Sequence, residues 1–199
     1  MKTFKVLISL FALTLFISSC SGKKEEEKEK QAGEVSEMVE KITKEAEKMS
    51  NETPKEVVDA KLLKELLPDD ADGMARKEAS SEKTGAMGFK ISTAEGRYRD
   101  DNGSIEVNII DVAGTGALMG MAAWSMIDVD KETDDGYEKT TKYKGNKAYE
   151  KYNSKNKDGE IAVIVANRFV VTVKGNNVEL DKIKATLDDI DLGKLEDLK

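Results

Sequence analysis

The chain has 199 residues, 36% of them charged, and its formal net charge is −7 at pH 7. An acidic chain lacks the basic face that nucleic-acid binding needs, so we expect no nucleic-acid partner. The sequence has no histidine and one cysteine, Cys20, which excludes imidazole as a general base or metal ligand, an internal disulfide and a cysteine-based zinc site.

The first nineteen residues have the composition of a secretory signal peptide. Lys2 and Lys5 supply positive charge, and the apolar run at 6–17, "VLISLFALTLFI", is shorter than a membrane-spanning helix requires. The run ends in "ISSC" (17–20), which resembles the lipobox of bacterial lipoproteins, where the cysteine becomes the first residue of the mature protein and is acylated. The resemblance implies cleavage between Ser19 and Cys20 and a palmitate-type membrane anchor on Cys20. The alternative is an uncleaved membrane anchor with an incidental cysteine.

The residues that follow Cys20 bear on the location of the protein. Ser21 stands where an aspartate retains lipoproteins at the inner membrane of enteric-type bacteria, so the resemblance implies the outer membrane. The run "KKEEE" (23–27) is similar to the signal that sends lipoproteins of Bacteroidetes-type bacteria to the cell surface. The alternative for this run is a solvated tether. We therefore expect an outer-membrane lipoprotein that either faces the periplasm or is exposed on the surface.

Composition predicts three parts: a signal peptide (1–19), the lipidated cysteine with a charged tether (20–52), and one folded domain (53–199). The tether has no aromatic residue and too little apolar surface to fold alone. Apolar residues between Val35 and Met49 recur at helical spacing, so we expect a solvated helix over 34–49. A coiled-coil oligomerisation helix is the alternative, although the pattern is shorter than such helices need.

The folded domain is expected to begin with an amphipathic helix. Thr53 is a candidate N-cap, Pro54 suits the first helical position, Glu56 completes a capping box, and Pro68 ends the pattern. The apolar stripe of this helix consists of Val57, Val58, Leu62, Leu66 and Leu67.

After Pro68 the pattern changes to the alternation of β-strands. Strands are expected around Phe89–Ile91–Thr93, Ile105–Val107–Ile109, 137–143, 147–152, 160–165 and 169–174. Turns are predicted at Gly145–Asn146, at Asp158–Gly159 and near Asn167, where Arg168 is expected to pin the hairpin. An amphipathic helix over 178–192, with Val178, Ile183, Leu187 and Ile190 on its apolar face, closes the domain.

Short turns between consecutive strands predict an α+β fold in which one antiparallel sheet, a meander, packs against helices. The order of elements over 137–192 resembles a module of uncharacterised bacterial envelope proteins and, more distantly, PsbP-like sheets flanked by helices. The resemblance rests on a hydrophobic pattern and implies no catalytic residue.

A glycine-rich stretch, Gly114–Thr115–Gly116 followed by Gly120, has the strand–turn–helix setting of a dinucleotide site. Its GxGxxxG spacing, the half-polar strand before it and the polar hairpin after it argue against nucleotide binding, so no cofactor is expected. The apolar residues 118–127 predict a buried core helix. The alternative is the wall of a pocket for a small apolar ligand, contacted by Met119, Met121 and Trp124.

Two charged stretches are further candidates. Arg97, Tyr98 and Arg99 could contact a partner or grip a carboxylate or phosphate, but a solvated edge with local ion pairs is the more common structure. The acids of "DVDKETDDG" (128–136) partly resemble a calcium loop yet lack its spacing and its closing glutamate, so no metal site is expected.

The sequence therefore predicts a lipid-anchored cell-envelope protein with a non-enzymatic binding or structural domain, whose partner is an envelope protein or component. One alternative is a periplasmic or surface carrier of a small apolar ligand. A second is a hydrolase built on carboxylates or a Ser/Lys pair, although no nucleophile elbow is present. No catalytic residue is assigned.

Overall fold

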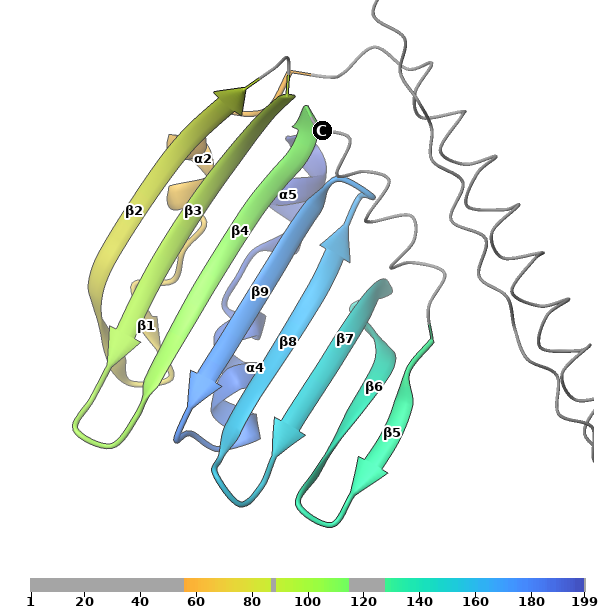
Figure 1. The fold of residues 1–199 in the computed structure, drawn as a ribbon. Coiled ribbons are helices and arrows are strands. Elements are labelled where there is room, and N and C mark those ends of the chain that lie inside the picture. Colours follow the sequence, from red (N-terminus) through yellow and green to blue (C-terminus); the bar gives the residue numbers. More distant parts are fainter. Residues whose placement is uncertain (1–55, 87–88, 115–127, 199) are drawn as a thin grey trace, which may run out of the picture. The chain divides into compact units, whose positions relative to one another are not determined.

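The computed structural model describes residues 56–86, 89–114 and 128–198. Their strands form one open antiparallel sheet in the order β1-β2-β3-β4-β9-β8-β7-β6-β5 (Figure 1). The strands are β1 (Asp70–Ala71), β2 (Met74–Ala86), β3 (Phe89–Arg99), β4 (Ser104–Gly114), β5 (Asp130–Thr133), β6 (Gly136–Tyr143), β7 (Asn146–Asn153), β8 (Asp158–Val165) and β9 (Phe169–Asn176). The described helices are α2 (Ala60–Lys64), α4 (Leu180–Asp188) and α5 (Leu192–Asp197).

The sheet consists of two meanders rather than one. Strands β1 to β4 are neighbours in chain order, and so are β5 to β9, but the two runs meet where β4 pairs with β9. The pairing runs from Ser104↔Asn176 to Asp111↔Phe169. The predicted antiparallel sheet is confirmed, while the described residues form a strand-dominated fold with only three short helices.

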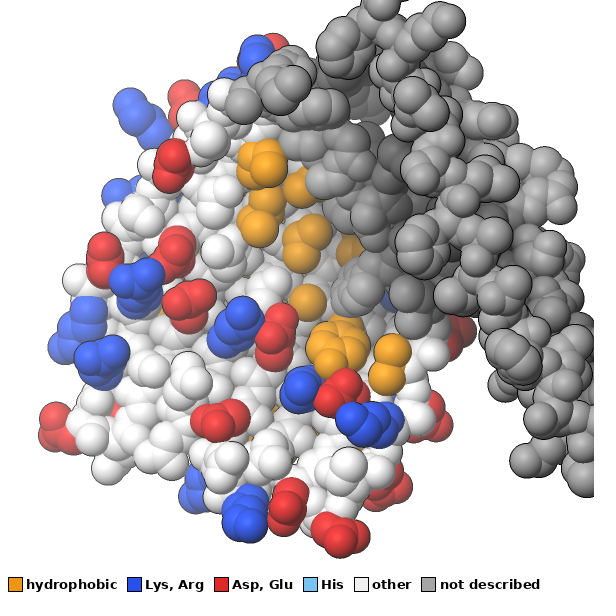
Figure 2. Space-filling model, viewed as in Figure 1, with side chains coloured by type: hydrophobic (Ala, Val, Ile, Leu, Met, Phe, Trp, Pro, Cys, Tyr) orange, Lys and Arg blue, Asp and Glu red, His pale blue; other side chains and the backbone are white. Residues whose placement is uncertain are grey.

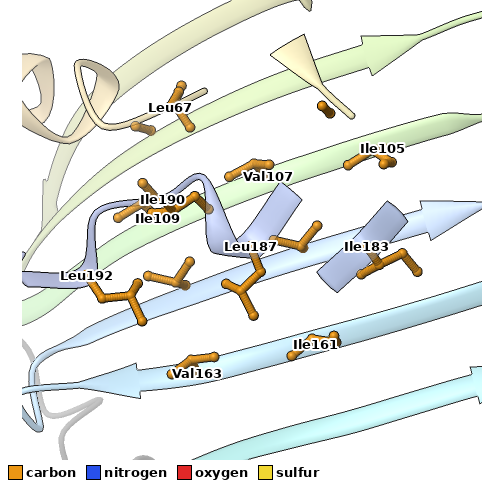
Figure 3. Packing of buried hydrophobic residues seen from close by; sticks show 14 of the residues in the cluster. Leu67, Ile105, Val107, Ile109, Ile161, Val163, Ile183, Leu187, Ile190 and Leu192 are labelled. Carbon is orange, nitrogen blue, oxygen red and sulfur yellow. The ribbon is translucent and has the colours of Figure 1, made fainter. Parts of the chain in front are cut away.

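The hydrophobic core lies between the sheet and α4 and α5, which both lie behind the sheet in Figure 1. Figure 3 shows Ile183, Leu187 and Ile190 over the strands. Alternate residues of β4 and β8 face them: Ile105, Val107, Ile109, Ile161 and Val163. Each of these side chains is almost completely buried, and full burial of one such side chain is worth about 1.5–3 kcal/mol. We call this side of the sheet the helix face.

The C-terminal prediction is right about the buried residues and wrong about the number of helices. Val178, Ile183, Leu187 and Ile190 are all buried. The chain nevertheless breaks after Asp188 and starts a second helix, α5, whose N-cap Asp191 accepts a hydrogen bond from the Lys194 amide at 3.1 Å. Ile190 continues the apolar pattern of α4. The next residue, Asp191, is a favourable N-cap, so a new helix begins there.

The first helix starts later than predicted. Glu56 to Asp59 are not helical, and α2 begins at Ala60 with Asp59 as its N-cap, whose Oδ1 accepts from the Lys61 amide at 2.9 Å. Leu62 is 41% exposed, so it does not belong to the buried stripe. The reason is that the main chain before Asp59 is hydrogen-bonded to the sheet instead of forming a helical turn. Thr53 and Pro54 lie outside the described residues.

Two predicted turns are shifted by a few residues. The β6–β7 turn is formed by Lys144 and Gly145, both with positive φ, and Asn146 is already paired with Tyr143. Likewise Asp158 and Gly159 are the first residues of β8, and the turn precedes them at 154–157. The predicted break near Asn167 is confirmed, with positive φ at Ala166 and Asn167.

Candidate functional site on the front face of the sheet

The front face of the sheet is the one turned toward the viewer in Figures 1 and 2, and none of the three described helices lies on it. Side chains of a strand point alternately to the two faces. On β4 the buried residues Ile105, Val107 and Ile109 point to the helix face, so Glu106, Asn108 and Ile110 point to the front. The front face has two features, a charge ladder and an apolar patch.

The charge ladder is a row of eight side chains of alternating sign that crosses eight adjacent strands. Each member is the direct cross-strand neighbour of the next. Figure 2 shows the corresponding band of alternating blue and red across the face. From β5 to β2 its members are Lys131, Glu138, Lys151, Glu160, Lys174, Glu106, Arg97 and Glu78.

Several neighbours in the ladder form ion pairs. Glu138 lies 3.0 Å from the Lys151 Nζ and 3.7 Å from the Lys131 Nζ. The hydrogen bond from Lys151 lowers the pKa of Glu138, and the same bond raises the pKa of Lys151. At the other end, Arg97 lies 3.3 Å from Glu78 and 3.8 Å from Glu106.

The ladder favours a single register of the sheet. Opposite charges directly across two strands stabilise the pair, and like charges destabilise it, by about 0.2–1 kcal/mol each. A one-residue slip would move the charges of that strand to the helix face. Because the members are partly exposed, each pair alone contributes little, and the effect depends on the row as a whole.

The apolar patch lies beside the ladder, further along the same strands. Ile110 of β4 pairs with Val170 of β9, which pairs with Ile164 of β8. Val112 and Ala162 complete the patch. Figure 2 shows orange side chains gathered over these middle strands. Ile164, Val112 and Ala162 are only 5%, 6% and 7% exposed, so the patch combines residues already shielded from solvent with the half-buried Ile110 and Val170.

Asn108 lies between the ladder and the patch, two residues from Glu106 and two from Ile110. Its Oδ1 atom is buried and has no hydrogen-bond partner among the described residues. A buried acceptor without a partner costs about 1–3 kcal/mol. Such a group needs an explanation in a native structure, and an ordered water or a bound partner that donates a hydrogen bond would provide one.

The structure separates Arg97, Tyr98 and Arg99, which the sequence presents as one cluster. Tyr98 points to the helix face, is completely buried and donates its hydroxyl to the Pro68 carbonyl at 2.7 Å. Burial raises the pKa of Tyr98 to about 12. Arg97 belongs to the ladder and also pairs with Glu95 at 2.6 Å. Arg99 is exposed and lines, with Lys77 and other residues, a hollow of about 510 Å³. Contact of these residues with a partner stays a prediction.

Other predicted residues lie outside the described part of the chain. These are Ser19 and Cys20, together with the stretch 115–127 that includes Met119, Met121 and Trp124. The calcium-like stretch is described: it forms β5 and the turn to β6, and Asp128 pairs with Lys147 at 3.1 Å. Within the described ranges, no three Asp, Glu, His or Cys side chains are grouped as metal ligands.

A second hollow, of about 460 Å³, lies beside the turn between α4 and α5. Asp188, Asp189, Asp191 and Glu196 line it. Asp188 accepts a hydrogen bond from the Tyr143 hydroxyl, and this bond, with a weaker contribution from Lys144, lowers the pKa of Asp188. A carboxyl that donates a proton near neutral pH needs the opposite shift, so Asp188 is unsuited to be the acid of a hydrolase.

The ladder was not expected from the sequence. Its only sequence signal is that oppositely charged residues occupy equivalent positions in neighbouring strands, and this becomes visible only when the strand order and register are known.

The described residues include no helix that is both long and apolar enough to cross a membrane. Comparison of the chain with known protein families, curated proteins and solved structures found no match.

Proposed function

We propose that this chain is a lipid-anchored protein of the bacterial cell envelope whose sheet domain binds a partner. The observation that carries the anchor is the position of the only cysteine, Cys20, directly after the apolar run and within "ISSC". Residues 1–19 then act as the signal peptide, residues 20–52 as the lipidated tether and residues 53–199 as the domain. Ser21 favours the outer membrane, facing the periplasm or, through "KKEEE", the surface.

The front face is the surface that we propose for the partner, an envelope protein or component. The charge ladder borders the apolar patch there, and Ile110 and Val170 are the patch residues that a partner can reach. Apolar residues surrounded by a polar rim are typical of protein interfaces. The buried, unpaired Oδ1 of Asn108 lies between the two features. The domain is proposed to act without catalysis; the carrier hypothesis depends on Met119, Met121 and Trp124 and stays a prediction.

Metabolic labelling tests the anchor. Cells that express the full chain are fed an alkyne-bearing palmitate, and the purified protein is examined for the label. We expect the wild type and the matched control Ser21→Ala, which keeps the thiol, to be labelled, and Cys20→Ser to be unlabelled. Equal labelling of Cys20→Ser and the wild type would show that the lipid is not on this cysteine.

Site-specific photo-cross-linking in cells tests the binding surface. A photoreactive residue at Thr172, on the front face beside Asn108, should give a discrete adduct, and one at Lys184, on α4, should not. The adduct should disappear when Glu106→Lys disrupts the ladder. An adduct from both positions, or one that persists in the Glu106→Lys protein, would count against the front face.

A further inference from the structure

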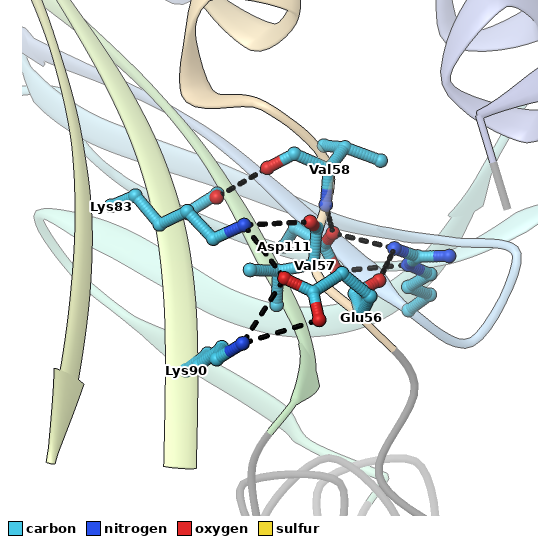
Figure 4. A network of polar contacts seen from close by, with 8 residues as sticks. Glu56, Val57, Val58, Lys83, Lys90 and Asp111 are labelled. Carbon is cyan, nitrogen blue, oxygen red and sulfur yellow. Dashed lines mark hydrogen bonds and ion pairs between the residues drawn. The ribbon is translucent and has the colours of Figure 1, made fainter. Parts of the chain in front are cut away.

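The first described residues, Glu56 to Val58, are held against the sheet mainly through their main chain (Figure 4). The Val58 amide donates to Asp111 Oδ2 at 2.8 Å, and the Val58 carbonyl accepts from Ser92 Oγ at 2.5 Å. The Val57 carbonyl accepts from Lys83 Nζ at 3.3 Å. These bonds join residues 26 to 53 positions apart in sequence.

Arg168 completes the arrangement from the β8–β9 turn. Its Nη2 donates to the Glu56 carbonyl at 3.0 Å, and its Nη2 and Nε donate to Asp111 at 2.7 and 2.9 Å. Asp111 also accepts from the Ala113 amide at 3.0 Å. The Asp111 carboxylate therefore accepts four hydrogen bonds while completely buried, as a buried charge requires.

The side chains of the segment add to this attachment. Val57 is 2% exposed, so it is inserted into the protein interior. The Glu56 carboxylate lies 3.0 Å from Lys83 Nζ and 3.1 Å from Lys90 Nζ. Hydrogen bonds from these two lysines lower the pKa of Glu56. Both lysines are well exposed, so this outer pair of bonds contributes less than the buried ones.

We propose that Ser92, Asp111, Arg168, Lys83 and Lys90 form an anchoring site, which we call the clamp. It binds an extended segment of this same chain, residues 56–58, near the middle of the sheet. Main-chain atoms are its chief ligands, so it recognises an extended backbone. Lys83 and Lys90 pair with the Glu56 carboxylate, so the clamp also favours an acidic residue at the first position of that segment.

The clamp lies where the two meanders of the sheet join. Ser92 belongs to β3, Asp111 to β4, and Arg168 directly precedes β9. The clamp therefore spans the β4–β9 pairing at which the two meanders join. A displacement of the chain at Glu56 would therefore act, through the buried hydrogen bonds, on β3, β4 and the β8–β9 turn.

Amide hydrogen exchange of the full chain tests the clamp, and its outcome does not depend on lipidation. In Asp111→Asn the exchange of the Val58 amide should speed up at least tenfold more than the loss of global stability explains, and the amides of β7 and β8 report that global loss. The control Glu106→Gln, on the same strand but on the front face, should leave Val58 unchanged. A trypsin-resistant core should begin at or before Glu56 in the wild type and only after Lys61 or Lys64 in Asp111→Asn.

The proposal is overturned if Val58 exchange and the resistant core are the same in Asp111→Asn and the wild type. It is also overturned if the loss of protection at Val58 merely equals that of the whole sheet. Should Asp111→Asn unfold, Ser92→Ala decides: it removes only the hydrogen bond to the Val58 carbonyl. Ser92→Ala must then accelerate exchange at residues 57–59 several-fold, with β8 unaffected; no change there would refute the clamp.

Discussion

Asp111 and Arg168, 57 residues apart in sequence, form a bidentate ion pair at 2.7 and 2.9 Å in which both side chains are shielded from solvent. The geometry is that of the strongest protein ion pairs, with two parallel charge-assisted hydrogen bonds. The pair also links β4 to the β8–β9 turn and, through Glu56 and Val58, to the N-terminal segment. The Asp111–Arg168 pair thus connects β4, the β8–β9 turn and the segment 56–58, which lie far apart in the sequence.

Asp111→Asn should lower the free energy of unfolding by about 3–5 kcal/mol, because it leaves the Arg168 charge buried without its partner. Urea unfolding followed by circular dichroism measures the change. Glu106→Gln, on the same strand but partly exposed, should cost less than about 1 kcal/mol. Equal losses of unfolding free energy in the two variants would show that the buried Asp111–Arg168 pair contributes no more to stability than an exposed charge.

Lys174→Glu should destabilise the domain in a salt-dependent manner. The variant places a third acid between Glu160 and Glu106 in the charge ladder, and like charges directly opposite cost up to about 1 kcal/mol each. Lys174→Gln removes the attraction without adding repulsion, so it serves as the control. The difference between the two variants should shrink between about 0.05 and 1 M NaCl, because salt screens exposed charges. A difference that salt does not alter would argue against the ladder.

Tyr98 should make the domain sensitive to alkaline pH. Its folded-state pKa of about 12, against 10.0 for the free side chain, means that the unfolded chain loses this proton first. The stabilising contribution is therefore complete below pH 10 and falls as the pH rises towards 12, by up to about 2–3 kcal/mol.

Tyr98→Phe tests this contribution, since other tyrosines also titrate in that range and only the difference between variants is informative. At pH 7 the variant should cost about 0.5–1.5 kcal/mol, because the Pro68 carbonyl still accepts from Arg76 Nη1 at 2.9 Å. Urea unfolding from pH 9 to 11 should show a smaller alkaline loss for Tyr98→Phe. If the free energies of unfolding of the wild type and Tyr98→Phe fell equally with pH, the buried position of the hydroxyl would be contradicted.

Gly145→Ala and Gly193→Ala should differ in their effect on stability. Gly145 has φ of +84° in the β6–β7 turn and nothing within 4 Å of an added Cβ, so its cost of about 1–2 kcal/mol comes from the backbone alone. Gly193 lies in the first turn of α5 without a positive φ, and an added Cβ would meet only the Asp191 Oδ1 atom at 3.3 Å. The gain in helix preference offsets the small shift of that oxygen, so the second variant should change stability by less than about 0.5 kcal/mol. Thermal unfolding that shows equal losses would contradict the turn geometry.

The sequence predicts best those elements that bury alternate side chains. Phe169, Val171 and Val173 alternate with more polar or less buried residues, and the strand around them is where the pattern indicates. The sequence pattern does not predict strand β2, because most of its residues after Met74 are exposed and charged or small. Since β1 pairs only with Met74 and Ala75, the rest of β2 forms the edge of the sheet, where such residues are common. Strand β5 is exposed throughout, so the sequence shows no alternation there that would predict a strand.

Features that depend on distant residues could not be predicted. Arg168 was expected to pin its own turn, and its amide does close that turn onto Val165 at 3.0 Å. Its side chain, however, reaches Asp111 and Glu56, and no local pattern encodes those partners. The late start of α2 has the same origin, because the competing hydrogen bonds of Val58 come from β3 and β4.

Mass spectrometry of the N-terminal peptide of the protein purified from its membrane fraction tests lipid anchoring through Cys20. We expect a mature chain that begins at Cys20 and carries acyl groups on that residue. A chain that still begins at Met1, or one that begins at Cys20 with an unmodified thiol, would contradict it.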